Sequence, residues 1–484
     1  MKTHNTFLAW ASASIASAVV LVGAAVAHVE PFWILLTGVA VPSLVFVMRR
    51  FPAVFIPLLI FIPALKTRPA AGFSPADPTF IAMALLYGAV VLNVFLVLSG
   101  ANESSLKQRF AGQGRSVAAF CLFAAVVAFS FLYSPVHAYG LDKLGRFVAI
   151  SAMLFFAPLV LLRDRRDFRH FVGATLALGL LVGAKVLVGI VRPAFMAAAK
   201  YTSQGMPEQD VTRIGPGQLV GITLLLLIFC HLLKGRINRL AITFSIPFLV
   251  AALVAATARG PIVSFVLVLG ISVVVARIRA QLMASKAMAL GVVALVVFTF
   301  AISLVWIQGT VARTKFETKK QELVQLLSGS SAPSYTAGKR LDFYANALIA
   351  ISKRPVAGWG LGGWSAYYNH QDFRSYPHNM FMEVGTEQGL LGLAALGFFF
   401  STMILPLRTI WREEREFIFL LPILAFAFCV AMFSGDLNDN HALWLWCGAA
   451  LAASRMLMTS RMHQTTRVIT LIHSLYPVRS DPGF

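Results

Sequence analysis

Residues 78–99 read PTFIAMALLYGAVVLNVFLVLS and contain no charged side chain. A helix of about 20 apolar residues crosses the ~30 Å hydrocarbon core of a bilayer, because each residue advances the helix by about 1.5 Å. Apolar runs of this kind recur along the whole chain. About 14 of them are candidate spans, at residues 7–27, 32–48, 51–65, 78–99, 116–133, 147–162, 170–191, 216–233, 240–256, 260–276, 287–307, 379–406, 417–434 and 441–458.

These runs predict an all-α, polytopic helical membrane protein with about 12–14 transmembrane helices. The composition agrees, since 58% of the residues are hydrophobic and 13% are charged, which excludes a water-soluble protein. Residues 51–65 contain Pro52, Pro57 and Pro63, so we expect a kinked or re-entrant piece there. Residues 1–27 have features of a signal peptide, but more spans follow at once, which favours an uncleaved first helix.

The net charge of +21 has two explanations, nucleic-acid binding and basic loops at the cytoplasmic membrane face. The sequence contains no compact basic domain that could hold nucleic acid, so we expect no nucleic-acid partner. Basic loops of a membrane protein gather on the cytoplasmic side. The four cysteines all fall inside apolar runs without metal-ligand spacing, and we interpret them as small core residues.

The distribution of basic residues predicts the orientation in the membrane. Clusters such as Arg163, Arg165 and Arg166 lie in alternate loops, and the positive-inside rule assigns these loops to the cytoplasm. The N- and C-termini are then both cytoplasmic, and the opposite face of the membrane is periplasmic if the cell is Gram-negative. The predicted divisions are N-terminal transmembrane helices at 1–308, a large periplasmic loop with short helices and site residues at 309–378, C-terminal transmembrane helices at 379–458, and a cytoplasmic tail at 459–484.

The stretch 338–393 is the predicted working end of the chain. Leu341, Tyr344, Leu348 and Ile351 recur at the period of one helix face. A glycine-rich turn, GWGLGG, follows and is more typical of tight packing than of a dinucleotide fingerprint. The run Pro-His-Asn then leads into the next apolar segment.

Three residues on the predicted outer face are candidates for chemistry. Arg259 stands alone in a short outer loop, where it either snorkels to lipid headgroups or binds a substrate. Arg340 opens a predicted helix, where a basic residue is unfavourable unless an anion is bound there; otherwise it is a solvated charge. His378 has an imidazole whose ordinary pKa near ~6.5 lets it accept a proton at neutral pH.

Acidic residues near the same face need a reason to be there. Glu383 and Glu387 begin a membrane segment, so we expect them either to pair with the arginines or to share in proton transfer. Asp436, Asp439 and His441 could brace the same cavity. The outer loops lack a paired acidic motif that would seat a divalent cation, and we expect no metal and no cofactor.

The run RPVAGWGLGGW…PHNMFMEVGTEQGLLGL, together with the upstream Ala-Arg-Gly, resembles the O-antigen ligase and O-antigen polymerase superfamily of bacterial membrane glycosyltransferases. The resemblance covers about residues 212–440 and implies that the protein lies in the inner (cytoplasmic) membrane of a bacterium. It implies a helical fold of the glycosyltransferase C type and an inverting, metal-independent transfer of a glycan from undecaprenyl diphosphate. The implied acceptor is lipid A-core for a ligase, or a growing glycan for a polymerase.

The resemblance also implies roles for individual residues. Arg259 and Arg340 look like the arginines that hold the lipid-linked diphosphate, and His378 looks like the base that activates the acceptor hydroxyl. Supporting candidates are Arg213, Tyr344, Asn379, Glu383 and Glu387. Polymerisation of O-antigen or exopolysaccharide repeats remains an alternative to ligation. A transporter of lipid-linked glycan is an alternative of another class, which would be expected to carry ionisable groups deep within several helices.

Overall fold

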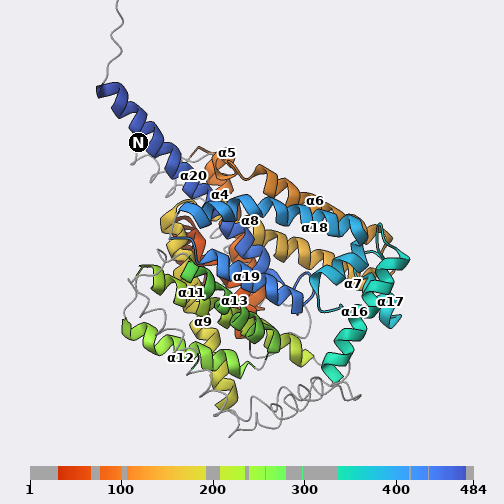
Figure 1. Cartoon of the computed structure of the whole chain (residues 1–484). Coiled ribbons are helices and arrows are strands. Elements are labelled where there is room, and N and C mark those ends of the chain that lie inside the picture. The colour runs from red at the N-terminus through yellow and green to blue at the C-terminus, as the bar shows by residue number, and fades with distance from the viewer. Residues whose placement is uncertain are drawn as a thin grey trace, which may run out of the picture. The chain divides into compact units, whose positions relative to one another are not determined.

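The computed structural model describes residues 31–66, 77–100, 106–191, 208–234, 239–256, 258–278, 297, 335–413, 416–433 and 435–475. Every regular element within these ranges is a helix, as Figure 1 shows. The predicted all-α, polytopic fold is confirmed. The apolar side chains place these segments in lipid, where no water can bind the backbone. A helix satisfies its backbone N–H and C=O groups within its own segment, so these segments are helical.

Six of the described helices are long and apolar enough to cross a membrane. They are Pro78–Leu98, Gly114–Tyr133, His137–Leu161, Arg165–Val188, Met380–Arg412 and His441–Ser460. Four shorter apolar helices accompany them, at Gly215–Phe229, Phe244–Ala255, Gly260–Ser272 and Leu420–Phe433. The predicted segments 7–27 and 287–307 fall on residues outside the described ranges, apart from Val297. The total of about 12–14 spans therefore stays a prediction.

By its internal contacts the chain divides into two compact units. Unit 1 comprises residues 1–110 and 156–175. Its helices α2 (Pro31–Arg50) and α3 (Phe55–Leu65) join through the 3-10 turn η1 (Pro52–Val54), and the chain bends there by 93°. Pro52 lacks an amide hydrogen and occupies the first position after the bend, which accounts for it. The expected kinked or re-entrant piece at 51–65 is confirmed. This unit also contains α4 (Pro78–Leu98), α5 (Leu106–Arg109), residues 156–161 of α8 (Met153–Leu161) and residues 165–175 of α9 (Arg165–Val191).

Unit 2 comprises residues 111–155 and 176–484 and carries the candidate site. Helices α6 (Gly114–Ser130) and α18 (Met380–Glu413) lie side by side along it. Phe120 of α6 is fully buried, stacks on Phe155 with ring centroids 3.9 Å apart, and meets Phe399 and Trp444 edge-on. Such aromatic contacts add to the free energy gained from burying the rings.

The remaining helices of the chain have the following bounds. They are η2 (Phe131–Tyr133), α7 (His137–Arg146), the π-helical η3 (Phe147–Ala152), α8 (Met153–Leu161), α9 (Arg165–Val191), α11 (Glu208–Lys234), α12 (Arg239–Ala255), α13 (Arg259–Ile278), α16 (Tyr335–Lys353), α17 (Gly363–Asn369), α19 (Leu420–Phe433) and α20 (His441–Leu475). Helices α7, η3 and α8 follow one another as a single span from His137. This span begins ten residues before the predicted start at 147.

Helix α18 is two helices joined at a break. Gly389 has φ 65° and ψ −157°, a backbone conformation that is essentially confined to glycine. The turn at 355–360 fills the break, because the amides of Trp359 and Gly360 donate to the carbonyls of Thr386 and Glu387 at 2.9 and 2.8 Å. Beyond the break, the amides of residues 390 and 391 donate to the carbonyls of residues 355 and 356 at 2.7 and 3.2 Å. The turn therefore satisfies backbone groups that a bilayer could not.

The glycines of the turn are needed for this close approach. A Cβ on Gly358 would lie 2.6 Å from the backbone of Glu387, and one on Gly389 would lie 2.4 Å from the carbonyl oxygen of Val356. Both distances are far below a van der Waals contact. The interpretation of GWGLGG as a tightly packed turn agrees with this geometry.

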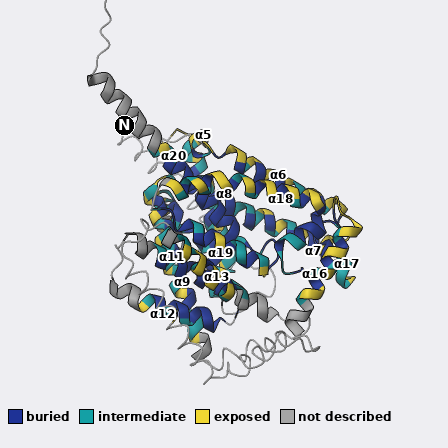
Figure 2. Cartoon of the chain, in the orientation of Figure 1, coloured by how far each residue is buried: buried dark blue, intermediate teal, exposed yellow. Residues whose placement is uncertain are grey.

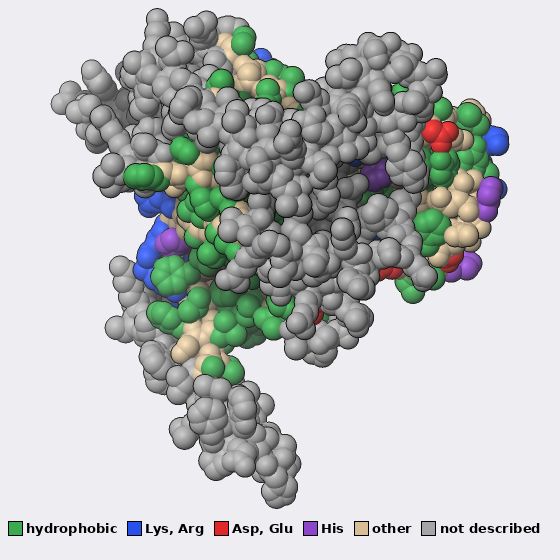
Figure 3. Space-filling model, turned by 90° about the horizontal axis from the view of Figure 1, so that it is seen from below, with side chains coloured by type: hydrophobic (Ala, Val, Ile, Leu, Met, Phe, Trp, Pro, Cys, Tyr) green, Lys and Arg blue, Asp and Glu red, His purple; other side chains and the backbone are tan. Residues whose placement is uncertain are grey.

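Helix α16 confirms the expected helix but exposes part of the predicted face. Leu341 and Leu348 are 63% and 57% exposed, whereas Phe343, Ala347 and Ala350 are buried. Figure 2 shows the same pattern on the long helices, with buried residues inside and exposed ones outside. On the face drawn in Figure 3, hydrophobic side chains make up much of the described surface and charged ones gather near its edges. An apolar exterior is expected of a protein that lies in lipid.

Candidate active site

His378 sits at the point where the loop after α17 enters α18. Its ring stacks on Phe343 of α16, with centroids 5.8 Å apart and planes 18° apart, and meets Tyr376 edge-on at 4.6 Å. Its backbone is left-handed, with φ 59°, a conformation that costs a residue with a Cβ about 1–2 kcal/mol. The surrounding contacts must therefore hold His378 in place, and this kind of strain is common at functional sites.

Asn379 explains why α18 starts where it does. Its side-chain oxygen accepts hydrogen bonds from the amides of Phe381 and Met382 at 3.0 and 3.1 Å, which satisfies two of the free donors of the first turn. Its amide nitrogen donates to the carbonyl of Met432, 3.1 Å away, near the end of α19. The residue after His378 is thus fixed by both helices.

Arg340 reaches the same end of α19. Its guanidinium donates to the carbonyl oxygen of Phe433 at 2.8 Å. A cation beside the last carbonyls of a helix is favourable, which gives a structural reason for a basic residue in this position. The structure therefore brings Arg340, Asn379 and His378 to one place.

The other predicted residues differ in how far the structure describes them. Tyr344 packs against the small core of Phe343, Ala347 and Trp364. Arg259 begins α13 and Arg213 lies in α11, but both side chains fall outside the described part of the structure. Their approach to His378 stays a prediction.

Glu383 and Glu387 have a partner that was not predicted. The ammonium of Lys143 on α7 lies 2.7 Å from both carboxylate oxygens of Glu387 and forms a shorter contact to Glu383. All three side chains are at most 1% exposed. The structure thus pairs both carboxylates with a lysine, while a contact to Arg259 and a share in proton transfer stay predictions. Removing one partner of a buried ion pair typically costs about 3–5 kcal/mol, so the three groups depend on one another.

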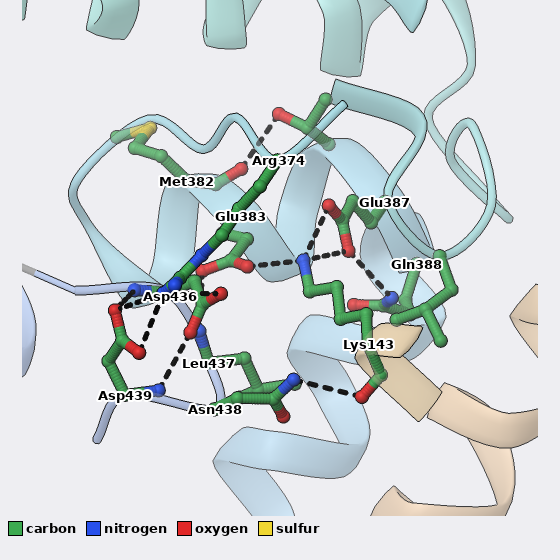
Figure 4. Close-up of polar contacts among 12 residues, drawn as sticks. Lys143, Arg374, Met382, Glu383, Glu387, Gln388, Asp436, Leu437, Asn438 and Asp439 are labelled. Carbon is green, nitrogen blue, oxygen red and sulfur yellow. Dashed lines mark hydrogen bonds and ion pairs between the residues drawn. The ribbon is translucent and has the colours of Figure 1, made fainter. Parts of the chain in front are cut away.

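The same cluster extends to the turn at 435–440, as Figure 4 shows. The amide of Leu437 donates to Glu383 at 2.8 Å, and the side chain of Asn438 donates to the carbonyl of Lys143 at 2.9 Å. Backbone and side chains of three separate segments therefore meet around one lysine.

A second set of charges closes the other side of that turn. Arg374 donates to both carboxylate oxygens of Asp439 at 2.6 and 2.7 Å and lies 3.4 Å from Asp436, which Arg146 also approaches at 3.6 Å. Burial opposes ionisation of Asp436, but the guanidiniums of Arg374 and Arg146 lower its pKa to about 2. Burial and the neighbouring Asp436 raise the pKa of Asp439. Asp436 and Asp439 thus brace the loop that leads to His378, and His441 begins α20 directly after this turn.

Sequence reasoning missed Lys143, Arg146 and Arg374. Lys143 and Arg146 lie between the predicted spans 116–133 and 147–162, although HAYGLDKLGR has one strongly polar and one apolar face as a helix. That periodicity was the available signal for α7. Arg374 lies in a loop, and its partners Asp436 and Asp439 lie 62 and 65 residues further along the chain. No local sequence pattern could predict a contact over that separation.

The described residues include no group of three or more His, Cys, Asp or Glu side chains arranged to hold a metal ion. Carboxylates and cations in the cluster bind one another instead. Metal independence stays a prediction.

Comparison with known proteins identifies one related family. Residues 244–397 match the family model described as O-antigen ligase. No curated protein matches the chain. The matched residues include α16, the glycine turn, His378 and the first half of α18.

Proposed function

We propose that the chain is a membrane glycosyltransferase of the ligase type, on the premise that its residues 244–397 match the O-antigen ligase family model. It transfers a glycan from undecaprenyl diphosphate to lipid A-core at the periplasmic face. The observation that carries the proposal is the convergence of Arg340, His378 and Asn379 at the start of α18.

The transfer needs a base on one side of the sugar and charge stabilisation on the other. His378 takes the proton from an acceptor hydroxyl, whose oxygen then attacks the anomeric carbon. The bond from that carbon to the diphosphate oxygen breaks, and negative charge develops on the lipid diphosphate. Guanidiniums stabilise such a leaving group through charge-assisted hydrogen bonds, and Arg259 and Arg340 take this role. Attack from the opposite side inverts the anomeric centre, and no metal or cofactor takes part.

A transporter is less well supported by the buried charges. Lys143, Glu383 and Glu387 neutralise one another within α7 and the first two turns of α18. Ion-coupled transporters instead place exchangeable ionisable groups near the bilayer midplane. Ion-coupled flux by purified protein in proteoliposomes would favour the transporter.

Deletion of the gene tests the substrate class. Loss of capped lipid A-core with the polymer retained on its lipid carrier identifies a ligase. Single repeats in place of polymer identify a polymerase and would contradict the proposal. Both outcomes are read from extracted lipopolysaccharide and lipid-linked glycan.

His378→Ala tests the base. We expect the transfer rate to fall about 10²–10⁴-fold, the usual loss when acid–base help is removed. The assay uses purified protein with donor and acceptor extracted from the deletion strain. His370→Ala is the matched control, because His370 is an exposed histidine of the same loop with a similar left-handed backbone, φ 56°. Near-full transfer by His378→Ala would mean that the base is elsewhere.

A further inference from the structure

Three buried charged side chains join α7 to the first half of α18. Lys143, Glu383 and Glu387 are 0%, 1% and 0% exposed. An ammonium has three N–H donors, and the three contacts of the Lys143 nitrogen, one to Glu383 and two to Glu387, use all of them. The lysine is therefore bound within the protein, and its side chain is not exposed.

The positions of the two carboxylates determine how the first half of α18 is oriented when both bind Lys143. Glu383 and Glu387 are four residues apart and lie on one face of α18, one above the other. A single ammonium that contacts both carboxylates fixes the rotation of that helix about its axis and its position along the axis. One contact alone could not fix both.

The first half of α18 needs such a tie of its own. The break at Gly389 separates residues 380–388 from the long helix that follows. The long part of α18 therefore does not determine the orientation of residues 380–388. At its far end lie the cap residue Asn379 and, next to it, His378.

We propose that Lys143 is a positioning residue that sets the place of His378, by holding Glu383 and Glu387 and with them the first two turns of α18. This inference rests on the proposed function, in which His378 is the base. Lys143 touches neither donor nor acceptor. It acts through the short helix, whose start leaves His378 between the rings of Phe343 and Tyr376.

A double-mutant cycle between Lys143 and His378 distinguishes positioning from a purely structural role. A base displaced by about 1 Å can lose about 10²-fold in rate, so we expect Lys143→Met to lower kcat about 10–100-fold in folded protein. We expect the KM for the extracted lipid-linked donor to change little. The double variant Lys143→Met/His378→Ala should then be no slower than His378→Ala alone, because a base that is absent cannot be misplaced.

Additive losses in the cycle would show that Lys143 supports only the fold, and would overturn the inference while leaving His378 as the base. Full transfer by His378→Ala alone would instead overturn the proposed base, and the inference with it. The two failures are therefore distinguishable from the single and double variants.

Two further variants keep the test decisive. If Lys143→Met does not fold, the triple variant Lys143→Met/Glu383→Gln/Glu387→Gln takes its place in the same cycle. This neutral set leaves no uncompensated charge among the three side chains. Recovery of full transfer by this neutral set would mean that charge compensation was the only role, and would overturn the inference. The control is Arg163→Met in unit 1, which breaks an ion pair of 2.6 Å to the buried Asp167. It should leave kcat per folded protein within about twofold.

Discussion

At the scale of single residues, Arg340 has one contact in the structure and one proposed role, and the two must be separated. Its contact to the carbonyl of Phe433 uses one of the five N–H donors of a guanidinium. In the proposed role the other donors bind a diphosphate, because a planar fork is suited to phosphate oxygens. A lysine at this position could donate to the carbonyl of Phe433, but it could not bind a phosphate through two parallel N–H groups.

We therefore expect Arg340→Lys to lower the transfer rate nearly as much as Arg340→Ala, about 10²-fold or more, as for other lost donors to a developing charge. Folded protein should be recovered in normal amount from the lysine variant, since its ammonium can still reach the end of α19. The measurement is kcat/KM for the lipid-linked donor with and without EDTA. Normal transfer by the lysine variant, or transfer lost to EDTA and restored by magnesium, would contradict the diphosphate role.

The residues of the site differ in how much of the sequence is needed to predict them. His378 and Asn379 could be predicted, because a polar pair before an apolar segment is visible within a few residues. Glu383 and Glu387 could be recognised as unusual, but their partner could not be identified. Lys143 lies 240 residues before Glu383, and only the folded chain brings them together.

At the scale of elements, the break in α18 is the feature on which the site depends. Gly389→Ala would place a methyl group 2.4 Å from the carbonyl oxygen of Val356, in a left-handed backbone. We expect a large fall in folded protein, since a backbone conformation that is essentially confined to glycine adds about 1–3 kcal/mol to a clash that the turn can relieve only by moving. Size-exclusion profiles and melting temperature in detergent measure it.

Gly397→Ala is the matched control in the same helix. Nothing lies within 4 Å of the added methyl group, and alanine is favoured over glycine in a helix by about 1 kcal/mol. This variant should be as stable as the natural protein or slightly more so. Equal losses from both substitutions would mean that the break is not constrained by the turn.

The elements themselves were predictable to different degrees. Long apolar runs gave the spanning helices, and prolines gave the bend at 51–65. The start of the span at His137 was not found, because its first ten residues are polar on one side and were interpreted as a loop. The buried side of α16 was not found either, since Leu341 and Leu348 satisfy a helical period whether they face protein or lipid.

At the scale of the whole molecule, the orientation in the membrane is a prediction from the charge of the loops. Positions Ser330 and Ser285 lie outside the described residues and are assigned to opposite faces. In a background without the four native cysteines, Ser330→Cys should react with an impermeant thiol reagent in intact spheroplasts, whereas Ser285→Cys should not. Equal labelling of the two would overturn the orientation.

The turn at 355–360 also limits how the chain can change in length. Four backbone hydrogen bonds fix its register against residues 386–391, so residues 361–385 form a loop whose two ends are held together. An inserted residue inside the turn would shift every bond by one place. The same insertion beside the exposed His370 and Gln371 only widens the tip. We therefore expect an inserted residue to be tolerated at that tip, and to disrupt the structure within the turn or within residues 386–391.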